Sequence, residues 1–418
     1  MVIGIIGGGA SGMAAALAAS ENKKNSVILL ERQTRLGRKL LATGNGRCNL
    51  TNMHVPDRTV RTDGTGSVPA NYHGDHPEFA EYALSRYSPE ETRSWFRRLG
   101  LLTVAEESGR VYPWSDQANS VLDVLRYSLE RDNIEIRTGF EAAKIRRIGR
   151  GFAVSNTDET VECERLIIAC GGIAGTKLGG SIAGYKLLKA MGHSSTRLRP
   201  ALVQVKTDWP ESASLRGVRA VCRASILHNG AETAFSRGEV QFTEYGLSGP
   251  VIFEISRDVC TQPGDWECEL DLLPDLTEND LAEELRIRCS GSRLNASELF
   301  VGLLHNRLGQ VLVRTAGIDM HTRAAALGST ELHAAAHAAK ALTVKIKEPL
   351  GMDAAQVTAG GICTDEFDER TMESKSVPGL YVCGELLDID GDCGGFNLQW
   401  AWSSGRLAGS AASDISKG

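Results

Sequence analysis

Residues 2–31 read VIGIIGGGASGMAAALAASENKKNSVILLE, and this stretch decides the fold. The apolar run 2–6, rich in isoleucine, predicts a strand, and the alanine-rich run 13–19 predicts a helix just after a glycine-rich turn. The next apolar run, 27–30, predicts a second strand. The order strand, turn, helix, strand is typical of an α/β fold of the Rossmann type.

The turn at 7–12 has glycine at three positions that matter for a bound nucleotide. Gly7 permits the tight turn, Gly9 lets a pyrophosphate approach the backbone, and Gly12 lets the helix pack close to the strand. Ala10 and Ser11 lie in the same turn, and the N-terminus of the helix that follows it favours phosphate charge. We therefore expect an anion-binding site at this turn.

An acid at the end of the second strand completes the dinucleotide pattern. Glu31 follows Gly7 by 24 residues, near the offset of about 20 residues at which an acid binds ribose hydroxyls. Its charge would repel a 2′-phosphate, although Arg32 beside it leaves that point open. This motif alone does not distinguish FAD from NAD.

Composition limits the classes of partner. The chain has 418 residues, with 46 Lys and Arg against 52 Asp and Glu, and 42% of its residues are hydrophobic. Such a composition is typical of a globular protein, and at about 150 residues per domain the length predicts two or three domains. The net charge of −6 does not favour binding to nucleic acid or to an anionic membrane, because both attract proteins with an excess of positive charge. We therefore expect a small-molecule substrate.

The cysteines indicate a reducing compartment. Ten of them are spread along the chain without a CxxC pair, which argues against a zinc cluster and a disulfide framework. The uncharged run 2–20 has no basic segment before it and is interrupted by glycines, so we do not expect a signal or membrane segment there. We expect a cytoplasmic location.

The far end of the chain favours FAD. Residues 379–385, GLYVCGE, predict a strand that ends in Gly384 and Glu385, and residues 394–399, GGFNLQ, predict a turn and a helix. An acidic strand end suits the hydroxyls of a ribityl chain, and a helix N-terminus suits negative charge on a reduced ring. Three aspartates lie between these segments, at 388, 390 and 392, but they lack the downstream glutamate of a calcium loop, so no metal is expected.

These segments resemble the HI0933-like flavoprotein family, also described as BaiN-like or aminoacetone-oxidase-like FAD-dependent oxidoreductases. The resemblance rests on 7–12 with Glu31, on 36–52 (LGRKLLATGNGRCNLTN) and on 384–399, and shorter segments along most of the chain agree with it. The shorter segments are 109–113, 166–172, 242–250 and 358–361. The chain departs from the family's Gly-Asp-Gly-Tyr element at 182–185, which reads IAGY, and this puts substrate or second-nucleotide contacts there in doubt.

The resemblance implies a glutathione-reductase-like Rossmann FAD-binding domain, interrupted by an inserted β-barrel plus a helical part. We expect the FAD-binding domain at 1–193 and 355–418, and a substrate-side insert at 194–354 that is β-rich over 200–275 and helical over 276–347. FAD would be held without a covalent bond. Within the first domain, residues 53–76 show little periodicity and are expected to form a surface loop.

The residues expected to bind the cofactor come from the motifs above, and the resemblance places 43–49 and 395–397 against the flavin. They are Gly7, Gly9, Ala10, Ser11, Gly12, Glu31, Arg32, Lys39, Thr43, Asn45, Gly46, Arg47, Cys48, Asn49, Gly172, Gly384, Glu385, Asp388, Gly395, Phe396 and Asn397.

No catalytic side chain stands out, because a flavin carries the redox chemistry itself. The positive charge of Arg47 would lower the pKa of the Cys48 thiol, but no resolving cysteine is close in sequence, so a packed thiol is favoured. Arg47 is expected to stabilise an anionic flavin or to hold the loop by hydrogen bonds. His73 and His193 are candidate proton donors, although a lone histidine is more often structural.

Other candidates have two interpretations each. Glu244 and Tyr245 could contact substrate or form a structural turn, and Trp400 and Trp402 are expected to pack against the sheet. The predicted activity is hydride transfer between flavin N5 and a small organic substrate, with NAD(P)H or O2 as the candidate electron partner. The alternatives are a tRNA-modifying flavoenzyme and a non-enzymatic flavin-binding redox sensor.

Overall fold

The computed structural model describes residues 1–60 and 67–414, so part of the predicted loop at 53–76 lies outside the described residues. The chain divides into two compact units. The first comprises Met1–Arg199 and Gln356–Gly418, and the second is Pro200–Ala355.

A five-stranded parallel sheet forms the centre of the first unit, which confirms the predicted Rossmann-type fold. Its strands, in sheet order, are β22 (Leu380–Val382), β13 (Arg165–Ile168), β1 (Val2–Ile6), β2 (Ser26–Glu31) and β9 (Ile134–Thr138). Most side chains of the three central strands are buried, as expected for a parallel sheet covered on both faces. Strands from the two ends of the chain thus belong to one sheet.

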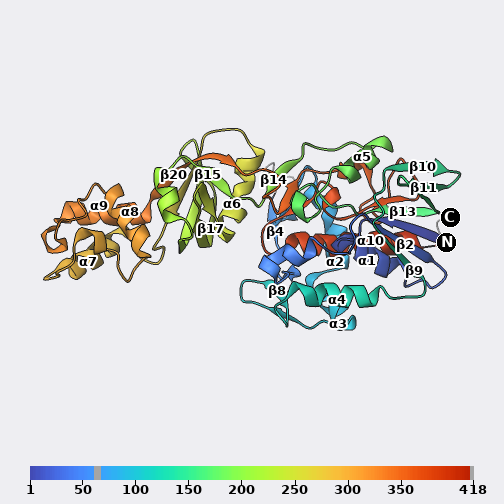
Figure 1. Ribbon diagram of the computed structural model, residues 1–418, viewed down its shortest axis with the longest axis horizontal. Coiled ribbons are helices and arrows are strands. Elements are labelled where there is room, and N and C mark those ends of the chain that lie inside the picture. The colour runs from blue at the N-terminus through green and yellow to red at the C-terminus, as the bar shows by residue number, and fades with distance from the viewer. Residues whose placement is uncertain (61–66, 415–418) are drawn as a thin grey trace. The chain divides into compact units, whose positions relative to one another are not determined.

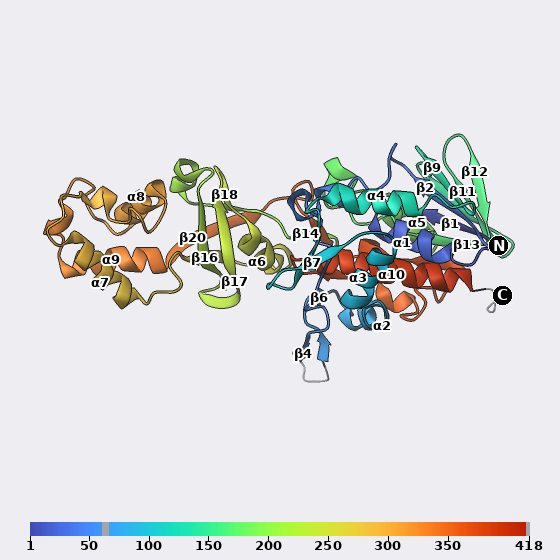
Figure 2. The same cartoon turned by 90° about the horizontal axis from the view of Figure 1, so that it is seen from below.

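The first and last helices of this unit pack against each other. Helix α1 (Ala10–Ala19) and helix α10 (Phe396–Ser413) lie side by side, blue and red in Figures 1 and 2. Glycines let the two backbones approach closely, because a Cβ atom placed on Gly405 would lie 2.3 Å from the carbonyl oxygen of Ser11. This contact joins the N-terminal nucleotide motif to the C-terminal helix.

Shorter elements surround this core. The helices are α2 (Glu81–Arg86), α3 (Pro89–Arg98), α4 (Ala118–Ser128) and α5 (Ala183–Ala190). The strands are β3 (Thr51–Asn52), β4 (Arg58–Val60), β5 (Ser67–Pro69), β6 (Tyr72–His73), β7 (Thr103–Ala105), β8 (Arg110–Pro113), β10 (Lys144–Ile148), β11 (Gly151–Ser155), β12 (Thr160–Cys163), β14 (Arg199–Ala201), β21 (Val357–Ala359) and β23 (Asp390–Gly391).

The expectation of a simple surface loop at 53–76 is wrong for the described part of that segment. Strands β4 and β5 pair with each other, and β6 pairs with β23 far along the chain. Strand β6 is only two residues long, so its pairing depends on a distant partner and leaves no periodic pattern in the sequence.

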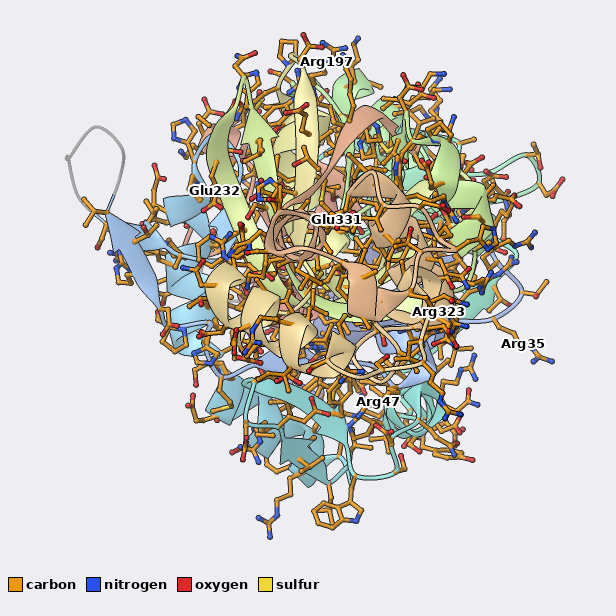
Figure 3. All side chains as sticks on the ribbon, turned by 90° about the vertical axis from the view of Figure 1, so that its left-hand side faces the viewer. Arg35, Arg47, Arg197, Glu232, Arg323 and Glu331 are labelled. Carbon is orange, nitrogen blue, oxygen red and sulfur yellow. The ribbon has the colours of Figure 1, made fainter. Side chains whose placement is uncertain are left out.

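The second unit combines a closed barrel with a helical part. In barrel order its strands are β15 (Val205–Thr207), β18 (Gly246–Ser248), β17 (Ala231–Phe242), β16 (Arg219–His228), β19 (Trp266–Asp271) and β20 (Leu342–Pro349). Its helices are α6 (Pro250–Thr261), α7 (Glu278–Cys289), α8 (Asn306–Thr315) and α9 (Ser329–Lys340). Helix α9 begins with a hydrogen bond from the Gly328 amide to Glu331, which Figure 3 labels.

The predicted helical region, 276–347, extends too far. Residues 342–347 belong to strand β20, which pairs with β15 and β19 and closes the barrel. Leu342, Val344 and Ile346 are buried while Thr343 and Lys345 are exposed, so the residues alternate as a half-buried strand requires. The helical part therefore ends at Lys340.

The longest helix among the described residues is α10, with 18 residues, and it contains the buried polar side chains of Gln399 and Arg406. No helix in this part of the chain is long and apolar enough to cross a bilayer.

The contact between α1 and α10 makes a testable prediction. Replacing glycine by alanine inside an open helix stabilises it by about 1 kcal/mol, but in Gly405→Ala the new Cβ would meet the backbone of α1. We expect the free energy of unfolding to fall by about 1–3 kcal/mol instead, with a lower Tm. Gly351→Ala is the control, because a Cβ there meets nothing within 4 Å. A higher Tm for Gly405→Ala would contradict the close packing.

Candidate functional site

The glycine turn after β1 has the geometry of a phosphate-binding turn. Gly7 has a left-handed φ of 110°, and its amide donates to the carbonyl oxygen of Leu30 at 2.8 Å. A Cβ on Gly12 would lie only 1.8 Å from the carbonyl oxygen of Gly7, so only glycine fits there. Gly7 and Gly12 are therefore required for the backbone conformation and close packing of the turn itself.

The third glycine faces open space. A Cβ on Gly9 would have no atom of the described chain within 4 Å, and Gly9 is the N-cap residue of α1. The first amides of the helix, at Ala10 and Ser11, have no intrahelical partner, because the helix supplies none in its first turn. Open space beside free backbone donors fits the diphosphate of a dinucleotide.

Glu31 closes the turn from the end of β2. Its Oε2 accepts from the Gly8 amide at 2.7 Å, and its Oε1 accepts from the Gln33 amide at 2.7 Å. The carboxylate is thus fixed beside the glycine turn. Arg32 points elsewhere, since its guanidinium donates to the carbonyl oxygen of Gly179 at 2.7 Å.

The C-terminal motif reaches the same turn. A Cβ on Gly384 would lie 2.5 Å from Ser11 Oγ, and Gly384 has a left-handed φ of 75°. Helix α10 holds Gly384 in place, because the Gly384 amide donates to Ser404 Oγ at 3.0 Å and Trp400 Nε1 donates to the Gly384 carbonyl oxygen at 3.1 Å. The two ends of the chain therefore meet within one unit.

Beside Gly384, the Glu385 carboxylate is the centre of a polar network. It accepts from Lys39 Nζ at 2.9 Å and from the Thr358 amide at 2.9 Å. Thr358 Oγ1 in turn accepts from the amides of Ile173 and Ala174, so the segment that follows Gly172 is fixed against the same carboxylate. Thr358 was not among the residues expected to bind the cofactor. The one feature of the sequence that could have indicated it is its place at the start of the TAGG segment, 358–361.

The predicted flavin loop and the predicted flavin turn belong to segments that lie against each other. The loop contains a 3-10 segment, η1 (Leu40–Gly46), which is interrupted by a kink that starts at Thr43, and Asn45 within the kink has a left-handed φ of 55°. Asn52 Nδ2 donates to the carbonyl oxygen of Gly394 at 2.9 Å. Asn49 lies beside Gly395, and its Oδ1 accepts from the Val111 amide at 3.2 Å. Residues about 345 positions apart therefore line one region.

Arg47 holds this loop from outside. Its guanidinium, labelled in Figure 3, donates to Asp116 at 2.5 Å and to Glu106 at 3.0 Å, and it lies 3.9 Å from the centre of the Tyr112 ring. Of the two expected roles, these contacts match the hydrogen-bonded support of the loop. The charge of Arg47 is already paired with two carboxylates.

Cys48 is a packed thiol, as favoured from the sequence. Its side chain is fully buried, and burial raises its pKa to about 12. The expectation that Arg47 lowers this pKa is wrong, because Arg47 points outward to acidic partners while Cys48 points into the core. Cys48 is therefore protonated at neutral pH.

The turn before α10 presents a helix N-terminus. Gly395 caps the helix with a φ of 105°, and the first helical residues are Phe396 and Asn397. The Asn397 side chain bridges back to Gly391, donating to its carbonyl oxygen at 2.6 Å and accepting from its amide at 2.8 Å. The positive end of α10 suits the negative charge of a reduced ring.

Two buried polar groups lie close to each other and to Glu385. Asp388 is 3% exposed and accepts from the Asp75 amide at 3.2 Å, and burial raises its pKa to about 6. The Tyr185 hydroxyl, in the IAGY element, is buried and has no hydrogen-bond partner among the described residues. An unpartnered buried hydroxyl is unfavourable unless a bound group satisfies it. Both are consistent with a site that a polar ligand completes.

The remaining candidates divide into core and surface. His193 is buried and lies 2.5 Å from Glu366, so it is a structural histidine. Trp400 and Trp402 are buried; the Trp400 ring lies beside Phe79, and the Trp402 ring lies beside Trp95 and Phe96 of α3, so the predicted packing against the sheet stays a prediction. In the second unit, Glu244 forms an exposed ion pair with Arg216, and the Tyr245 hydroxyl donates to Gln204.

Comparison with known proteins gives a match over nearly the whole chain. Residues 1–411 match the family described as HI0933-like protein Rossmann domain. A 3-dehydro-bile acid delta(4,6)-reductase from Clostridium scindens is 37% identical over 99% of each chain. Ribosomal RNA dihydrouridine synthases from Escherichia coli and Haemophilus influenzae are 32% and 28% identical, each over 96% of this chain and 95% of the relative.

The burial of Cys48 makes a prediction about its reactivity. A thiol with a pKa of about 12 has on the order of one part in 10⁴ thiolate at pH 8, and alkylation needs the thiolate. We expect iodoacetamide at pH 8 to leave Cys48 unmodified in the folded protein and to modify it after denaturation in urea, measured by peptide mass spectrometry. Rapid modification in the folded state would show that the loop exposes a reactive thiol.

The open space at Gly9 makes a second prediction. In Gly9→Val the new Cβ has no protein atom within 4 Å, so the apoprotein should fold with a Tm close to that of the wild type. The side chain would fill the space for the diphosphate, and loss of two charged hydrogen bonds at about 1.5 kcal/mol each weakens FAD binding by about 100-fold or more.

Titration of apoprotein with FAD, followed by flavin fluorescence, measures this loss. Gly351→Val is the matched control and should bind FAD as the wild type does. Unchanged FAD affinity in Gly9→Val would place the phosphates elsewhere.

Proposed function

The chain belongs to the HI0933-like family and is an FAD-dependent oxidoreductase, and from this premise we propose that it reduces a carbon–carbon double bond conjugated with a carbonyl group. The observation that carries the proposal is the meeting of Gly384 with Ser11, which brings a phosphate-binding turn and a ring-binding turn into one unit. Bound FAD supplies the chemistry, a hydride from N5 of the reduced ring.

The proposed arrangement assigns each part of FAD to residues in the first unit. The diphosphate would bind at Gly9, Ala10 and Ser11, and the ribose of the adenosine part at Glu31. The ribityl chain would lie along Glu385, and the ring between the 43–49 loop and the 395–397 turn. This assignment is supported by open space at the first turn, by carboxylates at two strand ends, and by two helix N-termini for negative charge.

The names of the two kinds of relative share one reaction type. A delta(4,6)-reductase of a 3-dehydro bile acid acts on double bonds conjugated with a 3-oxo group, and a dihydrouridine synthase acts on the ring double bond of uridine, next to a carbonyl. In both cases a hydride adds to the carbon remote from the carbonyl, which accepts the charge. Because both kinds of relative are named for reactions at such a double bond, we infer that this chain also reduces one.

Charge distribution favours a small substrate over RNA. Residues 200–355 carry 15 Lys and Arg against 21 Asp and Glu, so the second unit holds the whole net charge of −6. A polyanion such as RNA is repelled by an acidic surface. We propose a 3-oxo steroid with conjugated double bonds as the substrate class, and NAD(P)H rather than O2 as the electron partner.

Uridine in ribosomal RNA is the second candidate substrate. The relatives at 32% and 28% identity favour it, and the first unit is neutral overall, with 31 acidic and 31 basic residues. Its reduction would use the same hydride chemistry, so the two candidates differ in how the substrate is recognised.

Anaerobic half-reactions test the proposal. NADPH should bleach the flavin absorbance of the holoenzyme, and a 3-oxo-4,6-diene steroid should then restore it, with two hydrogens gained by the steroid in mass spectrometry. A 3-oxo steroid saturated at both positions is the control and should restore nothing. If only a uridine-containing ribosomal RNA fragment restores the absorbance, the second candidate is correct, and if neither does, the proposed reaction type is wrong.

A further inference from the structure

A histidine and an aspartate from opposite ends of the first unit form a close pair beside the ring-binding turn. His73 Nε2 lies 2.7 Å from Asp392 Oδ1. His73 is in β6, and Asp392 follows β23, the strand with which β6 pairs. Figure 2 labels β6 beside the N-terminal end of α10. Asp392 is therefore three residues from Gly395, the N-cap of that helix.

The pair is held in place by its neighbours on both strands. Asp392 Oδ2 accepts from Asn71 Nδ2 at 3.1 Å, and the Asp392 amide donates to the Asn71 carbonyl oxygen at 3.0 Å. The Tyr72 hydroxyl donates to the carbonyl oxygen of Phe396 at 3.0 Å, and Asn397 Nδ2 lies 3.2 Å from the Asp392 carbonyl oxygen. The proposed ring-binding residues Phe396 and Asn397 thus share hydrogen bonds with the strands that carry the pair.

The pair is also accessible, unlike the other candidate histidine. The His73 side chain is 30% exposed and that of Asp392 is 34% exposed, whereas the side chain of His193 is 0% exposed. With Nε2 directed at Asp392, the second ring nitrogen, Nδ1, has no hydrogen-bond partner among residues 1–60 and 67–414. A ring with one nitrogen held by a carboxylate and the other available has the arrangement of a general acid.

Reduction of a conjugated double bond needs such an acid. Once a hydride has bonded to the carbon remote from the carbonyl, the electron pair of the former double bond is left on the carbon next to the carbonyl and on its oxygen. That carbon must then gain a proton. Cys48 cannot supply it, because the thiol is fully buried, and the charge of Arg47 is paired with Glu106 and Asp116.

We propose that His73, oriented by Asp392, donates this proton from Nδ1 to the substrate carbon next to the carbonyl. The Nδ1–H bond breaks as the new carbon–hydrogen bond forms, and the neutral ring later takes a proton from water. Asp392 acts through His73, since its carboxylate fixes the ring orientation and so directs Nδ1 away from the pair. The inference rests on the proposed reaction type and adds the identity of the proton donor.

Separated half-reactions test His73. In His73→Gln holoenzyme reduced with dithionite, we expect reoxidation by a 3-oxo-4,6-diene steroid to slow by about 100-fold, within the range that general acids contribute. Reoxidation by ferricyanide, which takes electrons and needs no proton on carbon, should stay within about 2-fold of the wild type. His76→Gln is the matched control, because His76 is a nearby exposed histidine paired with Glu78 and should behave as the wild type.

Rescue experiments separate a chemical role from a structural one. Free imidazole should restore steroid-driven reoxidation in His73→Ala, and Asp392→Asn should lower kcat more than it changes KM. Steroid-driven reoxidation of His73→Gln at the wild-type rate, or loss of ferricyanide reoxidation together with it, would overturn the assignment to His73. A wild-type enzyme that no steroid reoxidises would instead refute the proposed function, and the inference would fall with it.

Discussion

The site depends on one close approach, between Gly384 near the end of the chain and Ser11 in the first turn of α1. Here a side chain on residue 384 would meet Ser11, so only glycine brings the two segments together at this distance. The packing of α10 on α1 maintains the contact over several turns, again through a glycine against backbone. This contact brings the N-terminal and C-terminal segments of the proposed cofactor site together.

Charge is arranged along the site in a consistent order. In the proposed arrangement Glu31 comes first, with a carboxylate that suits the ribose hydroxyls, and the N-terminus of α1 follows with partial positive charge for the diphosphate. Glu385, which pairs with Lys39, comes next and suits the hydroxyls of the ribityl chain, and the N-terminus of α10 is last. This order of hydroxyl, anion, hydroxyl and anion sites matches a flavin dinucleotide.

Local features of the site could be predicted from sequence, because they depend on neighbours in the chain. The glycine turn and the strand that ends at Glu31 both belong to this class. Strand β20 was assigned to a helix because its partners β15 and β19 lie at least 70 residues away and an alanine-rich helix precedes it.

Contacts between side chains that are far apart in the chain, and the directions in which neighbouring side chains point, could not be predicted from the sequence. Arg47 and Cys48 are adjacent in the chain but point to solvent and core respectively, so the expected charge effect on the thiol is absent. His73 and Asp392 were each noticed, yet 319 residues separate them, and nothing local indicates that they pair. Thr358 accepts hydrogen bonds from the amides at 173 and 174, and although it begins the 358–361 segment noticed in the sequence, that segment does not reveal these distant partners.

We propose that both ends of the chain hold one FAD molecule within the first unit, and a crystal structure of the protein supplied with FAD is the decisive experiment. We expect density for the diphosphate within hydrogen-bonding distance of the amides at 10 and 11, and for the ring against residues 395–397. Density for FAD at any other place, or none in a well-ordered crystal grown with excess FAD, would refute this placement.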